Sequence, residues 1–282
     1  MAADADADAL KLANDSGFPL QIAIERAVTE TSASHGWKVR YTEHAWVNAS
    51  DKQSGFADLI LEDRYGTAFL VVECKRVRQA TWLFMNSTGQ ANPRRNSKAW
   101  ISHYASGRMA HFGWHDIAIE PECPESIFCA VRGQSTNDRS TLLERIGGEV
   151  ISATEAIANE ERDYRLQSQE TMRLYFNIIV TTADLKVAKF DPAGVSLADG
   201  TIPDAEFDSV PFVRFRKQLS MRSFSLGPSD YEKGTNVSKL RENTVFVVRA
   251  DAFVDFLTRF DIPNSSLNKF QYAARWHDAT AG

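Results

Sequence analysis

The chain has 282 residues, of which 43% are hydrophobic and 24% are charged, and its formal net charge is −5. This length and composition are those of an ordinary globular protein with a sizeable core, and they exclude collagen-like, low-complexity and largely disordered chains. The net charge alone does not indicate a nucleic-acid binder.

The first half of the chain is predicted from its periodicity and turn residues. Its expected elements are an acidic flexible arm at residues 1–15, a helix at 17–31, strands at 37–47, 55–61 and 67–76, a helix at 97–112, a buried strand at 126–131 and a helix at 141–162. Ser16 is the expected cap of the first helix, and Pro19 suits its first turn. Gly66 marks a tight turn between the second and third strands.

The second half is richer in strand patterns. Strands are expected at 174–182, 185–190, 210–216 and 244–249, with a loop at 191–200, a polar segment at 220–237 and a last helix at 252–260. No linker rich in Pro, Gly or Ser divides the chain. We therefore expect one α/β domain over residues 16–282, with a core at about 17–160 and an extension of the same sheet at about 161–282.

Two carboxylates face each other in the predicted hairpin. If its strands pair about a centre between Tyr65 and Gly66, Asp58 lies opposite Glu73, with Cβ atoms about 5 Å apart. Lys75 points to the same face as Glu73, because side chains alternate along a strand. Like charges in that position destabilise a sheet, and a buried unpaired carboxylate is costly.

A divalent cation would resolve this repulsion. Asp58, Glu73 and the main-chain carbonyl of Cys74 are hard oxygen ligands of the kind that Mg²⁺ or Mn²⁺ prefers, and they leave room for water and a phosphate. Lys75 would then orient or deprotonate the attacking water. The alternative is a solvated hairpin face on which Lys75 only neutralises the two acids.

These residues resemble a known family. The segment GFAD ending at Asp58, the turn, and FLVVECK with Glu73 and Lys75 are similar to the active-site hairpin of the PD-(D/E)XK nuclease superfamily. Ala57 stands where that family's name-giving proline would be. The resemblance implies a restriction-endonuclease-like core (helix, three-stranded meander, helix, strand) over residues 17–131, with Asp58 and Glu73 as metal ligands and Lys75 as the catalytic lysine.

The resemblance also implies a carboxylate on the first helix. In many members an acidic residue there completes the metal site, which makes Glu25 a candidate catalytic residue and metal ligand. Glu25 is equally well explained as a surface residue of that helix, one turn beyond Gln21.

Positive charge is concentrated after the hairpin. Between Cys74 and His115 there is no acidic residue, and the candidate nucleic-acid-binding residues in this stretch are Arg76, Arg78, Arg94, Arg95 and Lys98. Aromatic residues are interleaved with them, which suits base stacking and phosphate contact.

Cysteine and histidine usage is sparse. Cys74, Cys123 and Cys129 are too few for a disulfide framework and indicate a reducing compartment. The spacing His111-x3-His115-x7-Cys123-x5-Cys129 is compatible with zinc, but the apolar surroundings of Cys129 favour packing. With neither a signal peptide nor a run long enough for a membrane helix, we expect a cytoplasmic protein without a membrane segment.

The sequence thus predicts a Mg²⁺-dependent phosphodiesterase that hydrolyses nucleic acid, DNA rather than RNA. The resemblance implies a role in restriction, repair or antiviral defence. The alternative is a non-catalytic nucleic-acid-binding or interaction subunit that retains the nuclease fold. The sequence leaves open whether the chain acts alone, as a homodimer or with a partner protein.

Overall fold

The computed structural model describes residues 2–50, 52–78, 80–87, 96–105, 108–131, 141–163, 171–219 and 241–268. Its elements in chain order are α1 (Ala2–Asp15), α2 (Phe18–His35), β1 (Lys38–Val47), β2 (Ser54–Glu62), β3 (Ala68–Lys75), β4 (Thr81–Ser87), β5 (Asn96–Ala105), β6 (Arg108–Ala118), β7 (Glu125–Ser126), β8 (Phe128–Val131), α3 (Leu142–Asp163), β9 (Thr171–Thr181), β10 (Asp184–Phe190), η1 (Pro192–Gly194), β11 (Glu206–Ser209), β12 (Phe212–Lys217), β13 (Asn243–Arg249), η2 (Ala250–Ala252) and α6 (Phe253–Arg259). The predicted polar segment at 220–237 lies outside the described residues.

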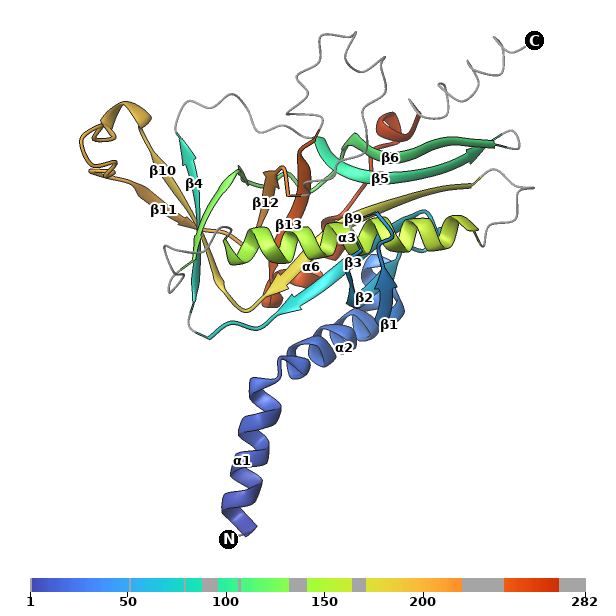
Figure 1. Ribbon diagram of the computed structural model, residues 1–282, viewed down its shortest axis with the longest axis horizontal. Helices are drawn as coiled ribbons and strands as arrows, with labels where there is room; N and C mark the ends of the chain where they lie inside the picture. The colour runs from blue at the N-terminus through green and yellow to red at the C-terminus, as the bar shows by residue number, and fades with distance from the viewer. Residues whose placement is uncertain are drawn as a thin grey trace.

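Within the described residues, nine strands form a large mixed sheet (Figure 1). Its main path runs β1-β2-β3-β9-β13-β12-β7, and the β5–β6 hairpin joins it through β9. The strands β1, β2 and β3 form an antiparallel meander, whereas β9 pairs in parallel with both β3 and β13. Because parallel neighbours need a crossover, β3 and β9 are far apart in sequence.

Each face of the large sheet carries its own core. On one face, α3 and the second sheet cover residues such as Ile60, Val71 and Ile179. On the other face, α2 and α6 cover residues such as Leu59 and Val72. Adjacent residues of β2 and β3 thus enter different cores, as expected for strands buried on both faces. No helix in the described part of the chain is long and apolar enough to cross a membrane.

A second sheet has four strands in the order β11-β10-β4-β8. Its strands β10 and β11 come from the second half of the chain, so the expectation that this half only extends the first sheet is wrong. The strands β9, β12 and β13 do extend it. The predicted strand at 126–131 is also divided, because β7 joins the large sheet and β8 the second sheet. Ile127 between them is 43% exposed.

The N-terminal segment differs from its prediction. Residues Ala2–Asp15 form the helix α1, which projects from the rest of the molecule (Figure 1), where a flexible arm was expected. The predicted helix at 17–31 is confirmed as α2, with Pro19 in its first turn. Its cap is Gly17 in the left-handed conformation, while the Ser16 hydroxyl donates to the carbonyl of Ala13 instead.

The predicted helix at 97–112 is wrong. These residues belong to the antiparallel strands β5 and β6, in which Trp100 pairs with Trp114. Both Trp100 and its neighbour Ile101 are 0% exposed. A strand buried on both faces lacks alternation of apolar and polar residues, and its apolar pattern then resembles that of a helix.

The order helix, three-stranded meander, helix, strand is nevertheless present. It consists of α2, β1–β3, α3 and β9, with β4–β8 inserted before α3. The second helix and the fourth strand of this order therefore lie later in the chain than the predicted 97–131, and β9 ends at Thr181, beyond the expected end of the core at about residue 160. The fold is mixed α/β, as expected.

Candidate metal centre

The β2–β3 hairpin brings Asp58 and Glu73 together. Leu59 pairs with Val72 and Ile60 with Val71, which confirms the predicted register as far as these residues. Continued by one residue, the same register sets Asp58 opposite Glu73. The backbone N–H of Cys74 donates to Oδ2 of Asp58 over 2.6 Å. This bond fixes the Asp58 carboxylate beside the strand that carries Glu73.

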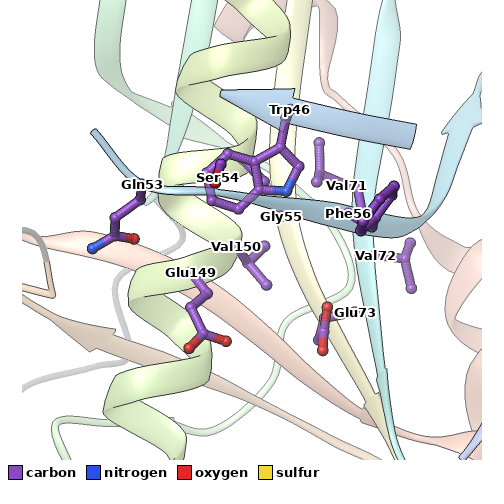
Figure 2. Close-up of a pocket in the computed structure, with 12 residues that line it drawn as sticks. Trp46, Gln53, Ser54, Gly55, Phe56, Val71, Val72, Glu73, Glu149 and Val150 are labelled. Carbon is purple, nitrogen blue, oxygen red and sulfur yellow. The ribbon is translucent and has the colours of Figure 1, made fainter. Parts of the chain in front are cut away.

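The Glu73 carboxylate projects toward α3. Val71, two residues before it on β3, belongs to the core under this helix. Figure 2 shows Glu73 and Glu149, which comes from α3, directed into the same space. Lys75 shares the face of Glu73 because it follows two residues later.

Burial and crowding raise the pKa values of both acids. The pKa of Glu73 rises to about 8, first because of burial and then because of the nearby charge of Asp58, while Lys75 opposes the shift and Glu149 and Glu43 add to it. The pKa of Asp58 is also raised, mainly by burial. Carboxylates held so close favour a proton or a cation between them.

Glu43 is a residue that the sequence analysis missed. Thr42 pairs with Leu59 and His44 with Ala57, which leaves Glu43 opposite Asp58 on β1. Its backbone has φ 51°, an uncommon value for a residue other than glycine. Continuing the predicted register from the hairpin to the first strand would have revealed it. Glu149 was missed because the predicted helix gave no indication of which face meets the hairpin.

Strand β9 fixes the chain at Lys75. The Lys75 carbonyl accepts hydrogen bonds from Oγ1 of Thr181 at 2.9 Å and from the N–H of Thr182 at 3.3 Å. Successive residues of a strand direct their backbone groups to alternate sides. The Cys74 carbonyl therefore faces β2 and Asp58. The Cys74 thiol packs against the α2-side core, and burial raises its pKa, so it is no nucleophile.

Helix α2 contributes Gln21 rather than Glu25. The buried Gln21 amide donates from Nε2 to the main-chain carbonyl of Asp58 at 3.0 Å. Glu25 instead accepts a hydrogen bond from Thr42 at 3.2 Å. Thr42 is the cross-strand partner of Leu59, whose side chain lies in the α2-side core. Glu25 thus lies on the α2 side of the sheet, away from the face of Glu73, and the structure does not bring it into the site.

The basic residues divide into three groups. Lys98 is 3% exposed, and its Nζ lies 3.0 Å from Oδ2 of Asp116, so its prediction as a nucleic-acid-binding surface residue is wrong. Arg76 and Arg78 are partly exposed and form ion pairs with Asp15 at the end of α1. Arg94 and Arg95 lie outside the described residues.

The structure does not assemble the residues of the zinc pattern. His111 and His115 are on β6, whereas Cys123 lies in the α2-side core and Cys129 in the α3-side core. Burial raises the pKa of Cys123 to about 11 and that of Cys129 to about 12. Both cysteines serve in packing.

The donors beside the hairpin fit a hard divalent cation. Within the described residues, no three His, Cys, Asp or Glu side chains are arranged as a ready metal-binding group. Asp58 and Glu73 with the Cys74 carbonyl supply oxygen alone, and water and substrate oxygens complete such a set in the manner of Mg²⁺.

Comparison of the chain with protein-family models, with curated proteins and with solved structures found no match. The geometry of the site therefore carries the functional argument.

Proposed function

We propose that this chain is a metal-dependent nuclease of the PD-(D/E)XK superfamily, with a restriction-endonuclease-like core and DNA as its substrate. The observation that carries the proposal is the β2–β3 hairpin, in which Leu59 pairs with Val72 and the N–H of Cys74 donates to the Asp58 carboxylate beside Glu73. Lys75 follows Glu73 by two residues and so shares its face. The order α2, β1–β3, α3, β9, with β9 parallel to β3, agrees with the core that the resemblance implies.

The residues of this chain have separate tasks in the reaction. Asp58, Glu73 and the Cys74 carbonyl would hold the cation. When bound, a divalent cation neutralises charge on the scissile phosphate and lowers the pKa of a water molecule. Lys75 would orient that water or, as a neutral amine, accept its proton. The ammonium group so formed would offset charge on the phosphate. Thr181 and Gln21 hold the backbones of Lys75 and Asp58 in place.

Cleavage assays test the proposal. Plasmid, linear duplex, single-stranded DNA and RNA are incubated with Mg²⁺ or Mn²⁺, and products are separated on gels. Asp58→Asn and Glu73→Gln should each lower the rate by about a thousandfold or more, because several kcal/mol of transition-state stabilisation are lost. Glu62→Gln is the matched control, since it makes the same change at the far end of β2 and should retain activity.

Lys75→Met separates chemistry from metal binding. It should lower the cleavage rate by a factor of about a hundred or more, as expected for the loss of a general base, while calorimetric affinity for Mn²⁺ changes little. Near-normal cleavage by Glu73→Gln would overturn the proposal. Binding of nucleic acid by the parent protein without cleavage in either metal would favour the alternative, a non-catalytic binding subunit.

A further inference from the structure

A pocket of about 370 Å³ opens beside Glu73, between β2 and α3 (Figure 2). Its lining includes Trp46, Ser54, Gly55, Phe56, Glu73 and Glu149. Its volume lies within the range of small-molecule sites. One side of the lining is apolar and aromatic, while Glu73 and Glu149 supply negative charge.

Trp46 brings an unused hydrogen-bond donor to the pocket wall. The residue is only 6% exposed, and its Nε1–H has no acceptor among the described residues. Figure 2 shows this nitrogen on the side of the ring that faces Val71 and Phe56, two other residues of the lining. A buried donor without a partner costs free energy, which an acceptor on a bound ligand would recover.

Gly55 allows this arrangement. It is the cross-strand partner of Trp46, and a Cβ at Gly55 would lie 3.2 Å from Cζ2 of the indole. The absence of a side chain lets the ring lie directly against β2. Phe56, the next residue, is 62% exposed and offers a free aromatic face beside the pocket.

The charge of the pocket restricts what can enter it. The negative charges of Glu73 and Glu149 repel a phosphate from the interior of the pocket. The cation, which attracts phosphate, would lie at Asp58 and Glu73 on one side of the pocket. A nucleobase is neutral, has apolar faces and carries hydrogen-bond acceptors on its edge. It matches an aromatic and aliphatic lining with one free N–H donor, and the exposed ring of Phe56 can stack on a base.

We infer that this pocket receives one unpaired nucleobase of the substrate, next to the phosphate that is cleaved. The inference rests on the proposed nuclease function and names its substrate class. A base within an intact duplex is stacked and paired, and its extrusion costs a few kcal/mol. The preferred substrate is therefore single-stranded nucleic acid or a single-stranded region, and intact duplex is bound and cut less well.

Binding measurements with Trp46→Phe test the donor. Labelled single-stranded and blunt duplex DNA are titrated in Ca²⁺, which fills such sites without supporting hydrolysis. Loss of one hydrogen bond should weaken single-strand binding about threefold to tenfold. Trp82→Phe is the matched control, because Trp82 on β4 is 0% exposed, its Nε1 also has no acceptor among the described residues, and it lies outside the pocket lining.

An abasic nucleotide tests the occupant. The abasic nucleotide is placed at successive positions of the single strand. In the parent protein it should lower the cleavage rate at one defined distance from the scissile bond. In Trp46→Phe, the abasic nucleotide should lower the cleavage rate by a smaller factor than in the parent protein, because the two changes remove the same interaction. If Trp46→Phe fails to fold, Ser54→Phe is the second variant. It adds a ring at an exposed position of the lining, fills the pocket and should weaken single-strand binding in the same way.

The outcomes separate the two proposals. Cleavage of blunt duplex as fast as of single strands, with no abasic effect and equal affinities for Trp46→Phe and Trp82→Phe, would overturn the pocket inference and leave the nuclease proposal intact. Equal competition by a free nucleoside monophosphate would show that the pocket serves free nucleotides, which also overturns it. Absence of metal-dependent cleavage on every substrate would refute the nuclease function itself.

Discussion

The ionised Glu73 carboxylate lowers the free energy of unfolding. Its pKa of about 8 means that the folded chain binds a proton there more tightly than the unfolded chain, whose value is 4.5. Between these pH values the proton is retained on Glu73 in the folded state and released in the unfolded state. The free energy of unfolding therefore falls as pH rises from 4.5 to 8, and the cost is complete above pH 8.

Glu73→Gln should remove this dependence. In the presence of EDTA, the variant should be more stable than the parent above pH 8 by on the order of 2 kcal/mol, and equally stable below pH 4.5. Thermal unfolding across the pH range measures the difference. Glu30→Gln, an exposed position on α2, is the control and should leave the profile of the parent unchanged. If the parent and Glu73→Gln profiles run parallel, the carboxyl at Glu73 is not strained.

Mg²⁺ should restore the stability that the parent protein loses as the pH rises. A cation replaces the proton between the two acids, so it should stabilise the parent most where Glu73 is ionised. The same cation should have little effect on Glu73→Gln at any pH. A thermal shift that is equal in parent and variant would place the ion elsewhere.

At the scale of the elements, an ion network fastens the β5–β6 hairpin to β12. Asp116 on β6 lies 3.0 Å from Nζ of Lys98 and 3.1 Å from Nη2 of Arg216 on β12. Both cations are 3% exposed. Arg216 also bonds Glu242 at 2.7 Å. The network holds the hairpin against the sheet rather than meeting a ligand.

Asp116→Asn should weaken the fold more than Lys98→Met does. The first change leaves two buried cations short of a partner and should cost about 2–3 kcal/mol, since Asp116 itself keeps some solvent. The second removes a buried charge and keeps the volume, so its cost should be below about 1 kcal/mol. Urea unfolding measures both. The reverse order would indicate that Lys98 has a role beyond this network.

The success of prediction differed between elements for physical reasons. The hairpin register followed from one turn residue, Gly66, and from strand alternation, so the facing acids were found from sequence. The strand at Trp100 and Ile101 is buried on both faces, which removes the periodicity that distinguishes strand from helix. Glu149 and the pocket depend on how α3 packs on the sheet, and no local pattern carries that information.

Over the whole molecule, charge is unevenly distributed. The chain has a net charge of −5, yet Arg76 and Arg78 directly follow the candidate site. Both are paired with Asp15, the last residue of α1. A nucleic acid reaching the site would compete with this carboxylate for the two guanidinium groups.

Salt dependence measures that competition. Arg76→Ala with Arg78→Ala should weaken nucleic-acid binding in Ca²⁺ and reduce the salt slope by about 0.7–0.9 for each phosphate that the protein no longer neutralises. Asp15→Asn should have the opposite effect on affinity because it removes the carboxylate that pairs with Arg78 and lies 4.0 Å from Arg76. Lys189→Ala, an exposed cation on β10 paired with Asp208, is the control. An unaltered slope in the double variant would assign these arginines to α1 alone.

The pairing of β3 with β9 also determines when the candidate site can be completed during synthesis. Oγ1 of Thr181 bonds the carbonyl of Lys75 across 106 residues of chain, and pairings so distant in sequence form slowly. A polypeptide leaving the ribosome has Asp58, Glu73 and Lys75 long before it has the strand that anchors them. Under the proposed nuclease function, no competent site would therefore form until well over half of the chain has been made, and a truncated product that ends before β9 should show no metal-dependent cleavage.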